Sequence, residues 1–151
     1  MSVGHQIAMA LRKTYWSMHR QADACFLPGG VTANQFVLLS LLSEEDGVTQ
    51  RELVDRASSD PNTVRAMLVA LEAKGLLTRA KSSADARARC IRLTAAGRRA
   101  YRRLWADSEG FRLRLAGVLT DAEQVRFLDM LDRVARVNAA PARPVSTAQG
   151  D

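Results

Sequence analysis

The sequence predicts a mainly α-helical (α+β) fold in which one β-hairpin interrupts a series of helices. Apolar residues recur at three- and four-residue spacing through most of the 151 residues, which is the period of helices with one buried face. Helix-capping patterns stand at the head of several of these segments. Short strand-like runs occur only between residues 76 and 93, and they predict the hairpin.

The first helix is expected over residues 5–26, and the PGG stretch at 28–30 ends it. Its apolar stripe is formed by Ile7, Leu11, Thr14 and Met18. Two further helices follow, and a capping box opens each of them. Thr32 with Gln35 forms the first box, and Thr49 with Glu52 forms the second. Val48, just before the second box, is expected to pack on Leu53 as a hydrophobic staple.

The fourth helix opens within SSDPNT. Asp60 is a good N-cap, and Pro61 suits the first helical position because its missing N–H would have no helical partner there. Gly75 follows this helix as a C-terminal cap. The predicted buried stripe is Val64, Leu68 and Leu71.

Residues 76–80 and 90–93 form the two strands of the expected hairpin, around a basic tip. Thr94 then begins a long helix that is expected to reach about Gly117. A third capping box, Thr120 with Glu123, opens the last helix. The tail, residues 139–151, is small, Pro-containing and polar, which is typical of disorder.

This order places a helix-turn-helix directly before a β-hairpin wing. In that arrangement the second helix of the pair enters the major groove of DNA. The predicted fold is therefore a winged helix-turn-helix in a single domain of residues 1–138. Its lobe spans about 32–93. The helices that flank it, at about 3–26 and 95–138, are expected to form a dimer interface, because so small a lobe cannot bury their apolar residues fully.

The positive charge of the chain is concentrated in one segment. The net charge is +6, but residues 74–103 alone carry ten basic residues and a single acid, so they sum to +9 and the rest of the chain to −3. Such clustering indicates a polyanionic partner. Nineteen of the 22 basic residues are Arg, which favours bidentate contacts to phosphate or guanine, although a high-GC genome produces the same bias.

Several classes of protein find no support in the sequence. Cys25 and Cys90 form no CxxC pair, and His5 and His19 are too few to complete a zinc cluster with them. Without a catalytic triad, a metal-ligand set or a Gly-rich phosphate loop, we expect neither an enzyme nor a cofactor. No apolar run approaches the roughly 20 residues of a membrane span, and the N-terminus lacks signal-peptide features, so a cytoplasmic location is expected.

The chain resembles the MarR family of bacterial transcriptional regulators. The stretch DARARCIRLT holds the wing pattern of that family, which is an Asp, any residue, an Arg, five residues and Leu-Thr. These positions are Asp85, Arg87, Leu93 and Thr94. The resemblance covers roughly residues 32–103. It implies a homodimer that binds a pseudo-palindromic operator in double-stranded DNA, and a repressor that a small aromatic or anionic effector releases.

The expected DNA contacts lie on the fourth helix and the wing. The helix contributes Pro61, Asn62, Thr63, Arg65 and Ala66 near its first turn. An Asn side chain suits adenine and an Arg side chain suits guanine. On the wing, Arg87 is expected to enter the minor groove, with Asp85 as its brace, while Lys81 and Arg89 contact phosphate.

Two basic features of the same segment remain open to more than one interpretation. Arg92 alternates with Ile91 along its strand, which is also the pattern of a solvated side chain. The second feature is a helical cluster of like charges that repel one another: Arg98, Arg99, Arg102 and Arg103. Either DNA phosphate or acids of a partner subunit would offset that repulsion.

The first helix holds the candidate effector residues. In the MarR family, effectors bind in a crevice between the DNA-binding lobe and the dimer helices, and Tyr15, Trp16 and His19 would line such a crevice. These residue types are also common in cores and dimer interfaces. The alternative function is a redox- or ligand-sensing regulator that acts mainly through protein partners, with Cys25 as its thiol. The family's peroxide-sensing branch, however, places its reactive Cys nearer the N-terminus and beside Tyr partners.

Overall fold

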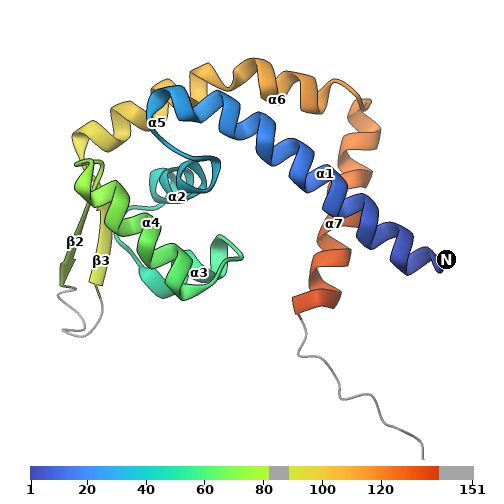
Figure 1. The fold of residues 1–151 in the computed structure, drawn as a ribbon, viewed down its shortest axis with the longest axis horizontal. Helices are drawn as coiled ribbons and strands as arrows, with labels where there is room; N and C mark the ends of the chain where they lie inside the picture. Colours follow the sequence, from blue (N-terminus) through green and yellow to red (C-terminus); the bar gives the residue numbers. More distant parts are fainter. Residues whose placement is uncertain (82–88, 140–151) are drawn as a thin grey trace, which may run out of the picture. The chain divides into compact units, whose positions relative to one another are not determined.

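The structure is a computed structural model that describes residues 1–81 and 89–139 (Figure 1). The chain divides into two compact units, Met1–Phe111 and Arg112–Asp151. The first unit contains α1 (Val3–Phe26), the 3₁₀ turn η1 (Leu27–Gly29), α2 (Ala33–Glu44), β1 (Val48–Thr49), α3 (Gln50–Arg56), α4 (Pro61–Ala73), β2 (Leu77–Lys81), β3 (Arg89–Leu93) and α5 (Ala95–Asp107). Helix α6 (Glu109–Ala116) crosses the boundary, and α7 (Asp121–Ala139) belongs to the second unit.

The predicted helix caps are present in the structure. The Thr32 hydroxyl accepts a hydrogen bond from the Gln35 backbone N–H at 3.1 Å, and the Gln35 side chain accepts one from the Thr32 N–H at 3.2 Å. Thr49 and Glu52 repeat this arrangement at the start of α3, as do Thr120 and Glu123 before α7. These local bonds satisfy backbone donors that have no partner within the helix, so they determine where each helix begins.

The core of the first unit is formed by the apolar stripes of its helices and sheet. The predicted stripe of α4, Val64, Leu68 and Leu71, is fully buried. The other large apolar side chains that are completely buried come from the segment before α2 and from α2, α3, the sheet and α5, and they are Val31, Leu38, Leu39, Leu42, Leu53, Leu77, Ile91 and Leu104. Helix α4 is thus held against the lobe by one face only, which leaves its opposite face in solvent.

The sheet has three antiparallel strands in the order β1-β3-β2, rather than two. The hairpin pairs Leu77 with Leu93 and Lys81 with Arg89, and the additional strand β1 pairs Val48 with Ile91. Two residues are too short a strand to show a sequence period, so β1 is defined only by its partner. The Val48 side chain is nevertheless buried as the predicted staple requires.

The long helix expected from Thr94 to about Gly117 is broken into α5 and α6 at Ser108. The buried Ser108 hydroxyl donates to the Trp105 carbonyl oxygen at 3.0 Å, and the Ser108 N–H donates to the Leu104 carbonyl oxygen at 3.1 Å. A serine that hydrogen-bonds its own helix backbone competes with the regular ladder. The prediction of one continuous helix was wrong because a single Ser is a weak signal for a break.

The start of α5 is fastened to the end of α4. The Thr94 hydroxyl donates to the Gly75 carbonyl oxygen at 2.7 Å and accepts from the Gly97 N–H at 2.9 Å. A Cβ atom on Gly97 would lie 1.9 Å from the Leu76 carbonyl oxygen, so only glycine allows this approach. The base of the wing and the end of the recognition helix therefore share one tight junction.

Among the described residues, no single helix combines the length and hydropathy of a membrane span. The segments Val3–Gly29 and Ala33–Glu44 together meet the length and composition criteria, but they are bent by 77° at their junction.

Candidate nucleic-acid interface

The residues of α4 predicted to contact DNA lie together on its solvent side. Pro61, Asn62, Thr63, Arg65 and Ala66 are all exposed, whereas Val64 between them is fully buried. The helix contacts α3 and β2 on its inner side, so it stands between the first helix of the pair and the wing (Figure 1). The structure thus presents the first turn of a helix-turn-helix recognition helix to solvent.

Asp60 shapes the N-terminal end of this helix. Its carboxylate accepts a hydrogen bond from the Thr63 N–H at 2.9 Å, and hydrogen bonds from Thr63 lower the pKa of Asp60. The Thr63 N–H is therefore already occupied, and a phosphate at this helix end would also meet a carboxylate. The N-terminal end of this helix, at Pro61, therefore has fewer free N–H groups for a phosphate contact.

The hairpin strands bring Lys81 and Arg89 directly opposite each other. The two residues are paired in the strand register, and both side chains are exposed. Like charges that face each other across two strands destabilise the pairing. A bound phosphate would offset this repulsion, which fits the contact predicted for both residues. Asp85 and Arg87, the predicted brace and minor-groove arm, lie outside the described residues.

One ion pair that was not predicted from the sequence joins the recognition helix to the wing. Arg79 on β2 donates from Nε at 2.9 Å and from Nη2 at 2.5 Å to the same oxygen of Glu72 on α4. The hydrogen bonds from Arg79 lower the pKa of Glu72, and the charge of Arg89 acts in the same direction. In the sequence, the only sign of this ion pair is that Glu72 and Arg79 carry opposite charges on either side of the turn at Gly75.

The arginines of β3 and α5 are partly compensated within the chain. Asp46 lies 3.4 Å from Arg92 and 3.6 Å from Arg98, so one carboxylate serves both guanidinium groups. Arg92 is exposed but paired, and therefore not simply solvated. In the part of the chain that the structure describes, Arg99, Arg102 and Arg103 are exposed and form no ion pair.

The candidate effector residues form a ring cluster on α1. The centroids of Tyr15 and His19 are 5.6 Å apart with the rings nearly parallel, and Trp16 packs edge-on to His19 at 5.9 Å. His19 Nε2 lies 3.4 Å from an oxygen of Asp23, whose other oxygen accepts from the Ala33 N–H at 2.7 Å. This cluster is linked through Asp23 to the first residue of α2.

Both thiols are free and half-buried. Cys25 packs against the core of the first unit, and the Cys90 thiol donates to the Gly47 carbonyl oxygen at 3.0 Å. Within residues 1–81 and 89–139, no group of three or more His, Cys, Asp or Glu side chains has the geometry of a metal site.

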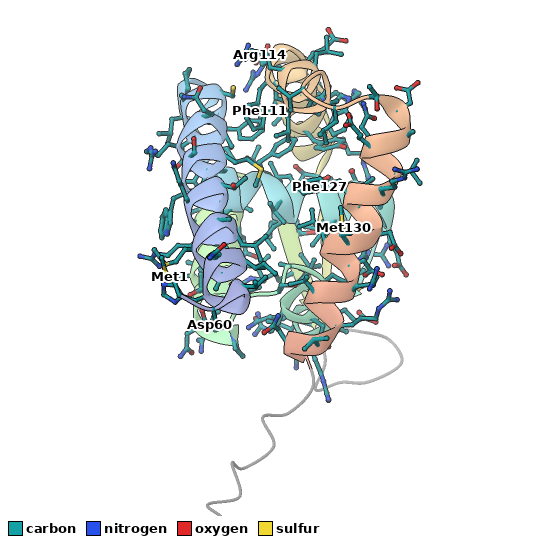
Figure 2. The ribbon with its side chains drawn as sticks, turned by 90° about the vertical axis from the view of Figure 1, so that its right-hand side faces the viewer. Met1, Asp60, Phe111, Arg114, Phe127 and Met130 are labelled. Atoms are coloured by element: carbon teal, nitrogen blue, oxygen red, sulfur yellow. The ribbon has the colours of Figure 1, made fainter. Side chains whose placement is uncertain are left out.

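The terminal helices expose apolar side chains. On α1, Ile7, Leu11 and Met18 are exposed. On α7, Val125 is 70% and Leu128 66% exposed, and Phe127 and Met130 project from one face of the same helix (Figure 2). Exposed apolar side chains along a helix are typical of a site of association.

Comparisons with known proteins agree with this architecture. The family model described as "MarR family" matches residues 31–88. An HTH-type transcriptional repressor of Mycobacterium tuberculosis is 32% identical over 114 residues, which cover 76% of this chain and 82% of the relative. A putative transcriptional regulatory protein for the hcr operon of Thauera aromatica is 26% identical over 140 residues, or 89% of this chain and 82% of that protein.

Solved structures share the fold over nearly the whole chain. The repressor CouR bound to a 23-mer DNA duplex has a TM-score of 0.79 and 27% identity, covering 89% of this chain and 98% of that one. PcaV of Streptomyces coelicolor in complex with its natural ligand has a TM-score of 0.72 and 27% identity, covering 93% and 95%. These regulators are not enzymes, in agreement with the sequence. The chain belongs to the MarR family of winged helix-turn-helix transcriptional regulators.

Proposed function

We propose that the protein is a homodimeric repressor that binds a pseudo-palindromic operator in double-stranded DNA and is released by a small aromatic or anionic effector. The observation that carries the proposal is the exposed first turn of α4 beside the paired cations of the wing. Asn62 and Arg65 supply the hydrogen-bonding groups that read adenine and guanine in the major groove. Lys81 and Arg89 supply the charge that positions the lobe on phosphate.

Sequence-specific reading is favoured over indiscriminate binding by the placement of these groups. A protein that bound any duplex would need only cations, whereas α4 presents an amide and a guanidinium at the end of a helix that is rigidly packed on its other face. The structure of CouR, 27% identical to this chain, is of a repressor on a DNA duplex. That relationship supports the same docking mode for this lobe.

Fluorescence anisotropy with the full-length protein tests DNA binding. The probe is a duplex from the region upstream of the gene, compared with a scrambled duplex of equal length at several salt concentrations. We expect tighter binding to the upstream duplex and a logarithmic affinity that falls linearly with the logarithm of the salt concentration. Equal, salt-insensitive affinity for both duplexes would instead favour a regulator that acts mainly through protein partners.

Dimerisation is proposed from the apolar faces of the two terminal helices. Neither helix buries its stripe within the chain, since Ile7 on α1 and Val125 and Leu128 on α7 are exposed. Sedimentation at micromolar concentration should show about twice the mass of the 16.6 kDa chain. A stable, folded monomer that lacks residues 1–26 would contradict the proposal.

The effector is proposed to bind beside Tyr15, Trp16 and His19. The link through Asp23 to the start of α2 offers a physical connection from this ring cluster to the lobe. PcaV, 27% identical, has been solved with its natural ligand, which supports a small-molecule effector here. Titration with phenolic acids should change the emission of Trp16, with Trp105 as a second reporter, and should weaken operator binding by about 5- to 150-fold. If every phenolic acid tried leaves both readings unchanged, this part of the proposal fails.

A further inference from the structure

The outer side of α4 carries an unusual stripe of residues. Asn62, Ala66, Val69 and Ala73 follow one another at spacings of four, three and four residues, which places them on one line of the helix. This outer stripe lies opposite Val64, Leu68 and Leu71, the buried residues of the same helix. All four members are exposed, and after Asn62 all of them are apolar.

A single exposed apolar side chain needs no explanation, but the position of Val69 sets it apart. Its side chain is 47% exposed, and it stands in line with the residue that is best suited to reading adenine. The outer surface of α3, which packs against α4, carries charges instead, such as Arg51 and Asp55. A helix face without long or charged side chains can approach base edges closely.

The electrostatics of the outer stripe fit a major groove better than another protein or a membrane. Arg65 flanks the stripe on one side and Thr63 on the other, and the segment of residues 74–103 that follows carries a net charge of +9. The cations of this segment, such as Lys81 and Arg89, would meet phosphate while the apolar centre met the bases, beside the guanine that Arg65 is proposed to read. The only apolar group that the major groove presents is the C5-methyl group of thymine.

The dimensions agree with this placement. Val69 lies seven residues after Asn62, which is about 10 Å along the helix axis and corresponds to roughly three base-pair steps. We infer that Ala66 and Val69 read thymine C5-methyl groups, so that each half-site contains an adenine contacted by Asn62 and, within about three base pairs of it, at least one thymine contacted by the apolar stripe. This inference rests on the proposed function, because it assumes that α4 docks in the major groove.

The experiment uses operator duplexes in which one thymine at a time is replaced by uracil in both half-sites. Uracil keeps the hydrogen-bonding groups of thymine and lacks only the methyl group. For the unchanged protein, we expect one or two positions at which uracil weakens binding by about fourfold per half-site, or about 15-fold for the palindrome, from the burial of one methyl group. The operator itself is first obtained by selection from random duplexes with the full-length protein.

The variant Val69→Ala should bind the thymine operator more weakly and should lose its sensitivity to uracil at one of these positions. Val37→Ala is the matched control, because Val37 is 41% exposed on α2, outside the outer stripe, and this variant should keep the full uracil penalty. Since Val69 is exposed, circular dichroism should show that both variants fold as the unchanged protein does.

The outcomes separate this inference from the function on which it rests. If the selection yields no preferred duplex, the proposed function fails. If an operator is found but uracil is tolerated at every position, or Val69→Ala keeps the uracil penalty of the unchanged protein, the reading of thymine methyl groups is wrong while the function stands. An operator whose half-sites contain no thymine within about three base pairs of the contacted adenine would also overturn the inference.

Discussion

Glu72 on the recognition helix and Arg79 on the first wing strand are joined by two hydrogen bonds to one carboxylate oxygen, at 2.5 and 2.9 Å. The pair bridges the turn at Gly75, where the chain passes from α4 to β2. In a winged helix these two elements address different parts of the duplex. The angle and spacing between them therefore matter for binding, and this ion pair constrains both.

Replacement of Glu72 by Gln should lower specificity more than affinity. The loss of a negative charge by itself strengthens binding to any duplex, whereas a looser wing weakens binding to the operator. We expect operator affinity to fall about three- to tenfold while affinity for a scrambled duplex is unchanged or higher. Fluorescence anisotropy with both duplexes measures the ratio of operator affinity to scrambled-duplex affinity. Glu44→Gln is the control, since Glu44 pairs with Arg56 at 2.9 Å and does not contact the wing; a parallel loss of operator affinity in both variants would contradict the role of Glu72.

Arg65→Ala and Arg87→Ala should have different effects on binding. Arg65 faces solvent on the first turns of α4, and its loss should weaken operator binding by about 1–3 kcal/mol and relax the preference at one position of each half-site. Arg87, predicted from the wing pattern to enter the minor groove, should affect many sequences and lower the salt slope by roughly one unit per arm. Asp85→Ala should resemble Arg87→Ala more mildly, and tighter operator binding by that variant would show that Asp85 is no brace.

Gly97→Ala should destabilise the first unit by about 1–3 kcal/mol. A Cβ atom at this position would meet the Leu76 carbonyl oxygen at 1.9 Å, and backbone on both sides prevents an easy adjustment. Urea unfolding followed by circular dichroism measures the change. Gly4→Ala is the matched control, because a Cβ atom there has no neighbour within 4 Å in the described residues and alanine is the better helix former. Equal urea midpoints for Gly97→Ala and Gly4→Ala would contradict the close approach of Gly97 to the Leu76 carbonyl group.

Asp23→Ala should remove the bond between α1 and the first residue of α2. The carboxylate accepts from the Ala33 N–H at 2.7 Å and is 30% exposed, so we expect a loss of about 1–2 kcal/mol in the free energy of unfolding. Asp55→Ala, at an exposed side chain of α3, should change stability much less. If the effector binds as proposed, Asp23→Ala should also reduce the effect of a phenolic acid on operator binding. An undiminished effect would show that Asp23 does not connect the ring cluster of α1 to the lobe.

Stability should fall in acid and be nearly constant near neutrality. Hydrogen bonds lower the pKa values of Glu52, Asp60, Glu72 and Glu123. A carboxyl group with a lowered folded-state pKa stabilises the fold fully above its unfolded pKa, which is about 4, and loses that contribution as the pH falls through the folded value. The urea midpoint should thus change little between about pH 5 and 7 and drop below about pH 4. In Glu72→Gln the urea midpoint should fall less steeply below about pH 4. The same fall in this variant and in the unchanged protein would contradict the contribution of Glu72.

The sequence alone determined the features that depend on neighbouring residues. The caps at Thr32, Thr49 and Thr94 follow from side chains that reach backbone groups three residues away, and the structure contains each of them. The buried stripe of α4 follows from the helical period in the same way. The wing pattern from Asp85 to Thr94 indicates the family without any tertiary contact, since it consists of residue types at set spacings.

The tertiary structure decided the features that depend on residues far apart in the chain. Strand β1 exists because Val48 meets Ile91, and Asp46 pairs with Arg92 and Arg98 because the loop before β1 folds against β3 and α5. The break at Ser108 depends on its burial, which the sequence does not show.

Val69 shows the same limit within the candidate interface. Val69 is not among the contact residues predicted from the sequence, which all lie near the first turn of α4. The helical period places Val69 off the buried stripe and in line with Asn62, and the packing of α4 on the lobe shows that its side chain is left exposed. Local patterns specify helices and their ends, because the groups involved are close along the chain. Which face of a helix is left for a partner depends on what covers the other face, and that is determined by the folded lobe as a whole.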